Sequence, residues 1–340
     1  MGTIFTSLFN VDESEYKKQR LCYPRGMDSV VQSGESRKSQ NGENLNHSQL
    51  LGYAHLIDFH NCYPIVKWAG GKSHLLSELD SIIPSKFDRY FEPFLGGGAM
   101  FFHLLSYRNM RFTAYLSDIN KELITAYKVV KYNLGQLIEL LKKHQREYTR
   151  NPSEYYYKLR DEIKPVTDID KTARFISLNK TCFNGLYRVN RNGIFNVPMG
   201  RYKNPLICDN INLENVSKAL RYSKASIAIS DYKNALLKAE KDDFIYLDPP
   251  YHPTSSTANF TGYSDKGFGE DDQLELSKSF ARLDETGCKV LLSNSDTPLI
   301  RKLYSDFSTN IKEVHVSRLI SCKASRRVGY KELLISNYPS

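Results

Sequence analysis

The chain has 340 residues, of which 41% are hydrophobic and 25% charged, a globular composition that excludes collagen-like, mucin-like and wholly disordered classes. Its length allows two domains or one domain with a large insertion, and no run approaches the roughly 18 apolar residues of a membrane-spanning helix. The formal net charge of +9 is compatible with a polyanionic partner, although charge alone identifies no function.

The first 63 residues differ in charge from the rest. They hold six basic and seven acidic side chains, so residues 64–340 carry the whole positive excess, +10. The polar segment 28–48 indicates a flexible linker or tail, and 51–59 could form one short docking helix. Residues 1–25 carry seven charges and no secretory signal pattern. The six cysteines include no CxxC pair, which fits neither a disulfide framework nor a zinc site and indicates a reducing cytoplasm.

From Pro64 onward, strand and helix patterns alternate. Apolar runs predict strands over residues 89–94, 112–116, 226–229, 244–247 and 289–292, and a final hairpin that pairs about 312–320 with 331–338. Helical patterns cover 99–107, 121–132, 231–240, 271–286 and 297–305. Such alternation predicts a mainly parallel α/β sheet.

Residues 126–225 interrupt this alternation. Helical patterns continue to about residue 180, and 188–197 predict a hairpin with Arg191-Asn192-Gly193 at its turn. Over 171–206 there are seven basic residues and no acidic one, interleaved with aromatic residues. A charge run is commonly just a solvated face, but basic side chains mixed with aromatic ones suit contact with a nucleic acid. We therefore expect an inserted subdomain with a nucleic-acid surface.

Two glycine-bearing motifs stand near the first predicted strand. EPFLGGG at 92–98 occupies a strand-to-helix turn, where glycines let the backbone approach a ligand, and Asp118 ends the next strand. An acid about 20 residues after such a turn commonly bonds a ribose hydroxyl, so the pair favours an adenosine-containing ligand. KWAGGKS at 67–73 holds the only tryptophan; it is not a P-loop, because Val66 stands where that motif needs glycine.

A third motif, DPPY at 248–251, directly follows the apolar strand 244–247. Ligands of open α/β sheets bind at the carboxyl ends of strands, so chemistry is expected there. The two prolines remove N–H donors and fix φ. The motif thus offers a carboxylate, a rigid carbonyl and an aromatic face together.

In this order the motifs resemble those of the Dam-type DNA adenine-N6 methyltransferases, the D12 class with the α order of motifs. The resemblance covers about residues 65–338. It rests on KWAGGK at 67–72, EPFLGGG at 92–98, SDIN at 117–120, NKTCFNGLYRVNRNGIFNVPMG at 179–200, DPPY at 248–251 and STANFTGY at 256–263. It implies a Rossmann-like methyltransferase sheet with an inserted helical and hairpin DNA-recognition subdomain. The parts would be an N-terminal extension (1–63), two catalytic segments (64–125 and 226–340) and the target-recognition subdomain (126–225).

The resemblance also implies the cofactor, S-adenosyl-L-methionine, and its site. The cofactor-binding residues would be Trp68, Ala69, Lys72, Glu92, Phe94, Gly96, Asp118 and Asp248. The target adenine would be flipped out of the duplex, because its amino group cannot be reached in the stack. Asp248 and the Pro249 carbonyl would accept its amino protons, Pro250 would complete the rigid turn, and Tyr251 would stack on the base. No metal is implied.

DNA-binding residues follow from the same resemblance. They would be Lys67, Asn184, Leu186, Arg188, Pro198, Arg326 and Arg327. Arg188 would read a guanine, the commonest base partner of arginine. These matches are those of enzymes that act on GATC in double-stranded DNA, so we expect that partner, no membrane association, a monomer in solution, and a cytoplasmic, nucleoid-associated location.

Three alternatives stay open. The enzyme could methylate another adenine site or cytosine N4, although relatives that act on cytosine N4 more often carry Ser where Asp248 stands. A non-catalytic DNA-binding regulator could use the same scaffold, although the intact DPPY motif argues against it. Restriction-modification, mismatch-repair marking and protection of a phage or mobile element are all compatible with these motifs.

Overall fold

The computed structural model describes residues 62–72, 75–254, 268–316 and 330–339. Within these ranges seven strands form one sheet in the order β3-β2-β1-β4-β5-β7-β6. The strands are β1 (Arg89–Glu92), β2 (Thr113–Asp118), β3 (Ser226–Ile229), β4 (Phe244–Leu247), β5 (Lys289–Ser295), β6 (Ile311–Val316) and β7 (Tyr330–Ser336). Strands β1 to β5 pair in parallel, whereas β7 lies antiparallel between β5 and β6. The predicted mainly parallel α/β sheet is confirmed.

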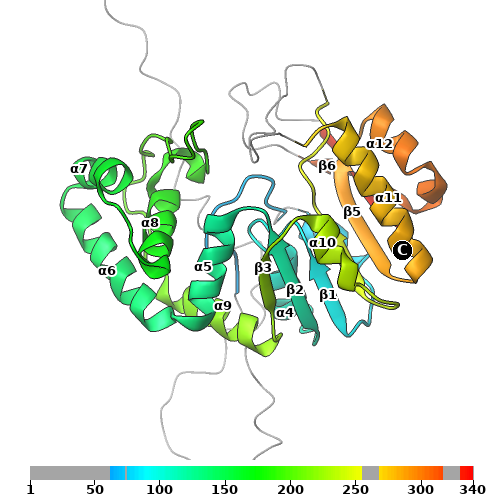
Figure 1. The fold of residues 1–340 in the computed structure, drawn as a ribbon, viewed down its shortest axis with the longest axis horizontal. Coiled ribbons are helices and arrows are strands. Elements are labelled where there is room, and N and C mark those ends of the chain that lie inside the picture. Colours follow the sequence, from blue (N-terminus) through cyan, green and yellow to red (C-terminus); the bar gives the residue numbers. More distant parts are fainter. Residues whose placement is uncertain (1–61, 73–74, 255–267, 317–329, 340) are drawn as a thin grey trace, which may run out of the picture. The chain divides into compact units, whose positions relative to one another are not determined.

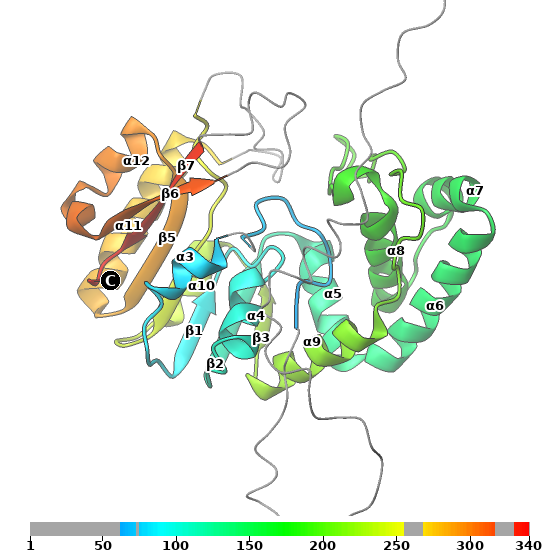
Figure 2. The ribbon, with the colours of Figure 1, turned by 180° about the vertical axis from the view of Figure 1, so that it is seen from behind.

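Helices cover both faces of the sheet. One face carries α10 (Tyr232–Ala235) and α11 (Glu270–Thr286), and the other carries α3 (Leu76–Asp80) and α4 (Ala99–Ser106), as Figures 1 and 2 show from opposite sides. Near the β5 side of the fold, α12 (Pro298–Leu303) precedes a 3-10 turn (Ser305–Asn310) and β6. A second 3-10 turn (Leu236–Lys238) follows α10. This doubly covered, mainly parallel sheet is the Rossmann-like arrangement that the sequence predicted.

The central strand β4 shows why this sheet forms. Its sequence FIYL is apolar throughout and all four side chains are buried, as expected for a parallel strand covered on both faces. Ile245 and Leu247 pack with Phe280 of α11 in one core cluster. Phe244 instead lies 5.6 Å from the ring of Tyr90, measured between centroids. The strand therefore joins two hydrophobic layers and holds the segment that follows it in place.

The inserted helices lie between β2 and β3 in the chain and extend beyond the β3 edge of the sheet (Figures 1 and 2). They are α5 (Lys121–Tyr132), α6 (Leu134–Arg150), α7 (Pro152–Tyr157), a π-helical turn (Lys158–Glu162), α8 (Asp168–Thr181), a 3-10 turn (Phe183–Gly185) and α9 (Asn210–Tyr222). A capping box between Thr167 and Asp170 starts α8, because each side chain bonds the other's backbone amide. The Asn120 side chain caps α5 immediately after β2.

Several expected element boundaries differ from the structure, among them that of the first strand, which ends at Glu92 rather than at residue 94. β5 continues through Ser293, Asn294 and Ser295, although the apolar pattern predicted an end at 292. The strand predicted over 112–116 is Thr113–Asp118. The hairpin at 188–197 pairs through one isolated bridge, between Val189 and Phe195, and a second bridge, between Cys182 and Met199, lies just outside it.

Several predictions lie outside the described residues: the linker 28–48, the docking helix 51–59, the loop 256–263, and Arg326 and Arg327. The antiparallel pairing of the last two strands is confirmed over the part that is described. The four-part division of the chain stays a prediction. Among the described helices, none combines the length and the apolar character needed to cross a membrane.

Candidate active site

The carboxyl ends of β1, β2, β4 and β5 lie at one edge of the sheet, because these four strands are parallel neighbours. Segment 92–98 begins at the end of β1, Asp118 ends β2, segment 248–251 follows β4, and β5 ends at Ser295. Ligands of open α/β sheets bind outside this edge. The glycine motif and the DPPY motif, far apart in sequence, thus follow adjacent strands.

The glycine turn after β1 packs against Trp68. Gly96 has a φ of +48°, and a Cβ added there would lie 2.9 Å from Trp68 Cδ1, so glycine lets the indole approach this closely. The Gly96 amide donates to Asp118 Oδ2 at 3.0 Å, and the Asn120 amide donates to Asp118 Oδ1 at 2.9 Å. Burial raises the pKa of Asp118, whereas these backbone amides lower it. Three residues expected at the cofactor therefore meet here.

Other residues expected at the cofactor surround this turn. Ala69 is exposed. Phe94 is half-buried and stacks on Tyr232 with 5.3 Å between ring centroids. Glu92 is 2% exposed and accepts a hydrogen bond from the Tyr90 hydroxyl at 2.8 Å. Burial raises the pKa of Glu92 to about 8. Below that pH the carboxyl group beneath the turn is mainly protonated and uncharged.

Asp248 is the carboxylate at the end of β4. Its Oδ1 accepts a hydrogen bond from Ser293 Oγ at 2.8 Å and pairs with Lys72 Nζ at 2.9 Å. Burial raises the pKa of Asp248, and the Lys72 charge is the largest effect that lowers it. Asp248 Oδ2 has no hydrogen-bond partner among the residues that the structure describes. Lys72, expected beside the cofactor, thus contacts the DPPY segment and leaves one carboxylate oxygen available.

The aromatic ring and the two proline carbonyls of the DPPY segment lie in different environments. The Tyr251 hydroxyl donates to Glu332 Oε2 of β7 at 2.8 Å, and Lys72 Nζ lies 4.5 Å from the Tyr251 ring centroid. The Pro250 carbonyl accepts from a glutamine of α11 at 2.9 Å. The Pro249 carbonyl accepts no hydrogen bond from any described residue. The residue that follows Asp248 in the chain therefore offers a second acceptor without a partner among the described residues.

Polar groups from α11 and β5 hold the backbone that follows the DPPY segment. Gln273 is fully buried, and its side chain donates to the Pro250 carbonyl while accepting from Asn294 Nδ2 at 3.0 Å. Asn294 Oδ1 accepts from the His252 amide at 3.1 Å, and Ser295 Oγ donates to the His252 carbonyl. A buried network in which each polar group has a partner rigidifies its segment. Segment 248–252 is thereby held in one conformation.

The opening segment is tied to the insertion through Asn179 of α8. The Lys67 amide donates to Asn179 Oδ1 at 2.8 Å, and Asn179 Nδ2 donates to the carbonyls of Lys67 and Gly185, each at 2.9 Å. A Cβ added at Gly185 would lie 2.5 Å from Lys67 Cδ, so the two segments are in close contact. Lys67 and the segment expected to read DNA are therefore placed together.

The remaining residues expected at DNA lie on the insertion. Arg188 is exposed, and its Nε and Nη2 donate to the side chain and the carbonyl of Asn196 at 2.8 and 3.2 Å. Asn184, with a φ of +54°, and Pro198 are exposed, whereas Leu186 is half-buried. Asn196, across the hairpin, thus holds the orientation of the Arg188 side chain.

Comparison with known sequences identifies the family of this chain. A family model described as D12 class N6 adenine-specific DNA methyltransferase matches residues 68–320, which include the glycine turn, the insertion and the DPPY segment. The chain belongs to that family. Because the match includes both the glycine turn and the DPPY segment, this D12 class methyltransferase is an adenine-specific enzyme that acts on DNA.

Individual relatives agree with the family assignment. The Type II methyltransferase M1.LlaDCHI of Lactococcus lactis subsp. cremoris is 42% identical over 283 residues, covering 82% of this chain and 96% of that protein. The Type II methyltransferase M.MjaIII of Methanocaldococcus jannaschii is 44% identical, covering 81% and 99%. The DNA adenine methylase of Escherichia coli (strain K12) is 35% identical, covering 79% and 93%.

Two residues of this D12 class site were missed by sequence reasoning. Ser293 and Glu332 contact the side chains of Asp248 and Tyr251, yet neither belongs to a motif. Ser293 gave a signal that could have been followed, because it is the polar residue that directly follows the apolar run 290–292. Glu332 gave none, since only the insertion of β7 beside β5 brings it to the site.

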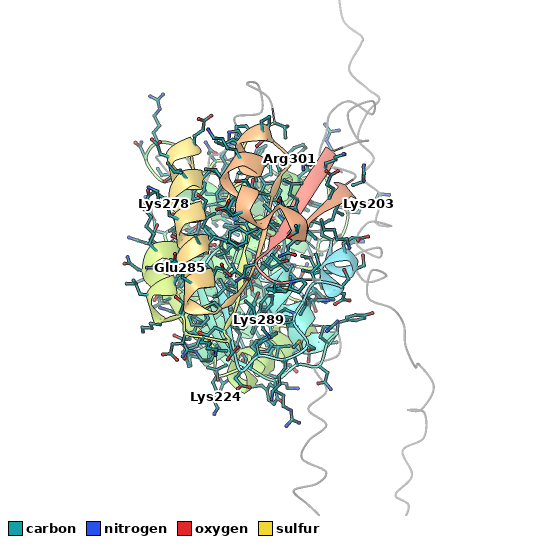
Figure 3. The ribbon with its side chains drawn as sticks, turned by 90° about the vertical axis from the view of Figure 1, so that its right-hand side faces the viewer. Lys203, Lys224, Lys278, Glu285, Lys289 and Arg301 are labelled. Carbon is teal, nitrogen blue, oxygen red and sulfur yellow. The ribbon has the colours of Figure 1, made fainter. Side chains whose placement is uncertain are left out.

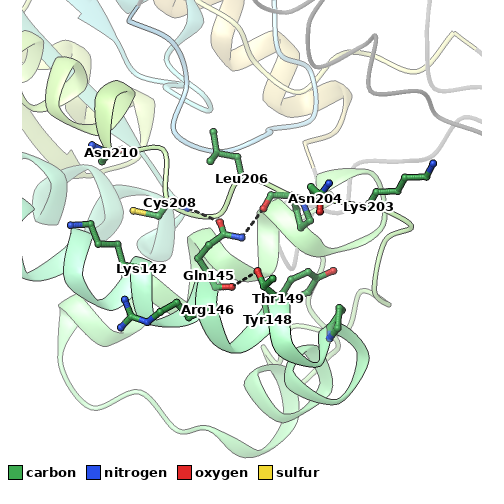
Figure 4. Close-up of a pocket in the computed structure, with 12 residues that line it drawn as sticks. Lys142, Gln145, Arg146, Tyr148, Thr149, Lys203, Asn204, Leu206, Cys208 and Asn210 are labelled. Carbon is green, nitrogen blue, oxygen red and sulfur yellow. Dashed lines mark hydrogen bonds between the residues drawn. The ribbon is translucent and has the colours of Figure 1, made fainter.

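A cavity of about 490 Å³ lies elsewhere in the methyltransferase, between α6 and the segment 203–210 (Figure 4). Gln145 crosses it to bond backbone groups of that segment. Lys203 points away from Lys142 and Arg146, so these cations do not converge on a common point. The cavity therefore lacks the arrangement of an anion site.

Proposed function

We propose that this enzyme transfers a methyl group from S-adenosylmethionine to N6 of an adenine in double-stranded DNA, within the sequence GATC. The observation that carries the proposal is the pair of unused acceptors at the end of β4, Asp248 Oδ2 and the Pro249 carbonyl, beside the ring of Tyr251. An exocyclic amino group has two protons to donate, and this segment offers two acceptors.

The glycine turn suits the proposed cofactor. The close contact between Gly96 and Trp68 leaves no side chain between the indole and the turn, and Asp118 ends the neighbouring strand with its carboxylate held by backbone amides. Trp68, Ala69, Glu92, Phe94, Gly96 and Asp118 would hold the cofactor around this turn. S-adenosylmethionine supplies a methyl group on a sulfonium, an electrophile that needs no covalent protein nucleophile.

Asp248 and Pro249 would act on the target amino group. The nitrogen lone pair of adenine is delocalised into the ring, which makes the nitrogen a poor nucleophile. Hydrogen bonds from its protons to Asp248 Oδ2 and the Pro249 carbonyl would favour a pyramidal nitrogen and stabilise the positive charge that develops during transfer. Lys72 supports this role, because its charge favours the ionised, hydrogen-bond-accepting form of Asp248.

Tyr251 would stack on the flipped base, and its orientation depends on Glu332. The hydroxyl bond to Glu332 fixes the ring from the side of β7. Lys72 Nζ also lies 4.5 Å from the centroid of that ring. The base-flipped geometry follows from the general need to remove a base from the stack before its amino group can react.

Recognition of GATC would depend on Arg188. Arginine has five N–H donors, and the bonds to Asn196 engage two of its nitrogens, which leaves donors for the O6 and N7 atoms of a guanine. Several relatives between 34% and 36% identical are named DNA adenine methylases or DNA N-6-adenine-methyltransferases. The acid-free basic window around Arg188 supports duplex binding.

The opposite side of the catalytic domain carries charges of both signs, which suits it less to a polyanion. On the face shown in Figure 3, Lys278 pairs with Glu275 at 2.7 Å, and Arg301 pairs with Asp296 at 2.6 Å. In the window 171–206, Lys171 is likewise paired with Asp168 at 3.0 Å and Lys180 is buried, so the exposed cations that it offers to phosphate groups are Arg188, Arg191, Arg201 and Lys203. The proposed DNA surface is therefore the insertion side together with the DPPY edge.

The test is methylation of two duplexes that differ only in replacement of GATC by GTTC on one strand and its complement. Purified enzyme and S-adenosylmethionine should produce N6-methyladenine in the first duplex alone, measured by nucleoside analysis. Asp248→Ala should abolish the product while DNA binding persists, and exposed Asp271→Ala is the matched control that should stay active. N4-methylcytosine, or equal methylation of both duplexes, would contradict the proposal; binding without any product would favour the regulator.

A further inference from the structure

Tyr187 of the recognition segment reaches the proposed cofactor site, although its neighbour in sequence is the proposed guanine reader. The Tyr187 ring stacks on Trp68 with 5.3 Å between centroids and 27° between planes. Trp68 in turn lies directly against Gly96 of the glycine turn. One continuous stack therefore joins the residue beside Arg188 to the turn that would hold the cofactor.

The other end of Tyr187 reaches the second wall of the same site. Burial and the Glu122 carboxylate raise the pKa of Tyr187, and the Asn120 side chain lowers it, so both side chains lie near its hydroxyl group. Asn120 donates its amide to Asp118, the residue expected at the ribose. Tyr187 thus contacts neighbours of both the glycine turn and Asp118.

Packing around Tyr187 restricts its freedom to move independently. Phe175 of α8 lies edge-on to its ring at 5.7 Å, and Phe195 across the recognition hairpin lies at 6.1 Å. Phe175 also contacts Trp68 edge-on at 6.4 Å. A shift of the hairpin when Arg188 engages a base would therefore be transmitted to Trp68 through packed rings rather than absorbed by a gap.

We propose that Tyr187 is a positioning residue that couples target recognition to cofactor binding, so that DNA containing the target sequence and the cofactor each tighten binding of the other. The inference rests on the proposed function. Coupling between sites is reciprocal, so DNA changes cofactor affinity by the factor with which cofactor changes DNA affinity. A stacked aromatic pair contributes a factor of about 2 to 13 to an equilibrium constant, which sets the expected size.

Trp68 is the only tryptophan in the chain, so its fluorescence reports on this stack directly. The first measurement adds GATC duplex to the cofactor-free, full-length enzyme. Wild type should show a change in Trp68 emission and in its quenching by acrylamide, and the GTTC duplex should produce a smaller change. Wild-type Trp68 that responds identically to both duplexes would overturn the proposal without any variant.

The second measurement is the Kd of S-adenosylhomocysteine, which binds without turnover, with and without GATC duplex. The wild-type ratio of the two Kd values should be about 2 to 13. Tyr187→Ala should bring it close to 1, whereas Tyr187→Phe, which keeps the ring, should retain it. Tyr132→Ala is the matched control, because that ring is 63% exposed and contacts neither Trp68 nor the glycine turn among the described contacts.

The outcomes separate this inference from the proposed function. A ratio that Tyr187→Ala leaves unchanged, or that Tyr187→Phe loses completely, overturns the role of the ring stack. A purely structural role of Tyr187 would weaken both Kd values equally and leave their ratio intact. If wild type methylates GATC but shows a ratio of 1, only the coupling fails; if wild type binds no cofactor and forms no N6-methyladenine, the proposed function fails first.

Discussion

Replacing Lys72 by methionine should shift the pH–rate profile of methylation. Its acidic limb, where the rate falls as Asp248 becomes protonated, should move to higher pH. Lys72 Nζ lies 2.9 Å from Asp248 Oδ1, and Lys72 is 5% exposed. In the proposed mechanism, it is the ionised form of Asp248 that accepts the hydrogen bond from the amino group. Burial already raises the pKa of Asp248, and Lys72 is the main group that opposes this rise. Without the lysine charge, protonation of Asp248 therefore begins at a higher pH as the solution is acidified.

The size of the shift follows from the distance. At 2.9 Å and an effective dielectric constant of about 20, the attraction is about 6 kcal/mol, and the cost of burying both ions offsets most of it. An opposite charge this close typically lowers a carboxyl pKa by about 1 to 3 units. We therefore expect the limb to rise by about 1 to 3 pH units, with a loss of about 10- to 1,000-fold in rate at pH values below both limbs.

Single-turnover methylation at saturating cofactor and DNA, from pH 5 to 9, measures this limb. Lys72→Arg is the matched control, because it keeps a cation and should retain a limb near that of wild type. The rate of Lys72→Met should recover towards wild type at the alkaline end. A folded Lys72→Met enzyme that binds cofactor and has the wild-type limb would refute the electrostatic role of Lys72.

Three further predictions concern the turn, the fold and the recognition hairpin. Glu92→Gln should gain stability relative to wild type as pH rises from about 4.5 to 8, by up to about 1.4 kcal/mol per pH unit in urea unfolding, because the folded state holds Glu92 protonated until about pH 8. Gly96→Ala should weaken cofactor binding at least about ten-fold by calorimetry, since its Cβ would meet Trp68 at 2.9 Å in a strained backbone; Gly135→Ala, with open space around it, is the neutral control. Arg188→Ala should lose about 1 to 3 kcal/mol of discrimination at one base pair in competition binding.

Each of these has a contrary result. If the difference in unfolding free energy between Glu92→Gln and wild type does not grow with pH, the Glu92 carboxyl is not protonated in the folded state. Equal cofactor affinity in Gly96→Ala and Gly135→Ala would mean that Trp68 can move away from the added Cβ without weakening cofactor binding. Uniform weakening of Arg188→Ala on every duplex, with discrimination intact, would assign that arginine to the phosphate backbone.

The strands of the catalytic sheet could be predicted because their apolar runs are short, continuous and flanked by turn residues. Segment 244–247 was predicted with its observed bounds, and every side chain in it is buried. β5 was predicted three residues too short, since Ser293, Asn294 and Ser295 look like a loop in sequence. Their polar groups are satisfied by partners distant in the chain, which a local pattern does not contain.

The motifs placed most expected site residues near one another, but not their contacts. Lys72 was expected beside the cofactor because it belongs to the opening motif, and in the structure it pairs with Asp248. Tyr187 belongs to the recognition segment 179–200, for which the sequence predicted no contact with Trp68. Its stack on Trp68 depends on how the insertion lies against the opening segment, and no sequence periodicity encodes that arrangement.

The position of β7 has a consequence for synthesis of the enzyme. This strand lies inside the sheet, between β5 and β6, and supplies the carboxylate that holds the Tyr251 hydroxyl from 81 residues further along the chain. At 5–20 residues per second, a ribosome needs about 4 to 16 s to make that stretch. During this interval the Tyr251 hydroxyl has no anchor, and once β5 has been made its outer edge stays unpaired until β7 follows. A nascent chain should therefore remain unable to methylate, and prone to pair with other strands, until β7 has been inserted.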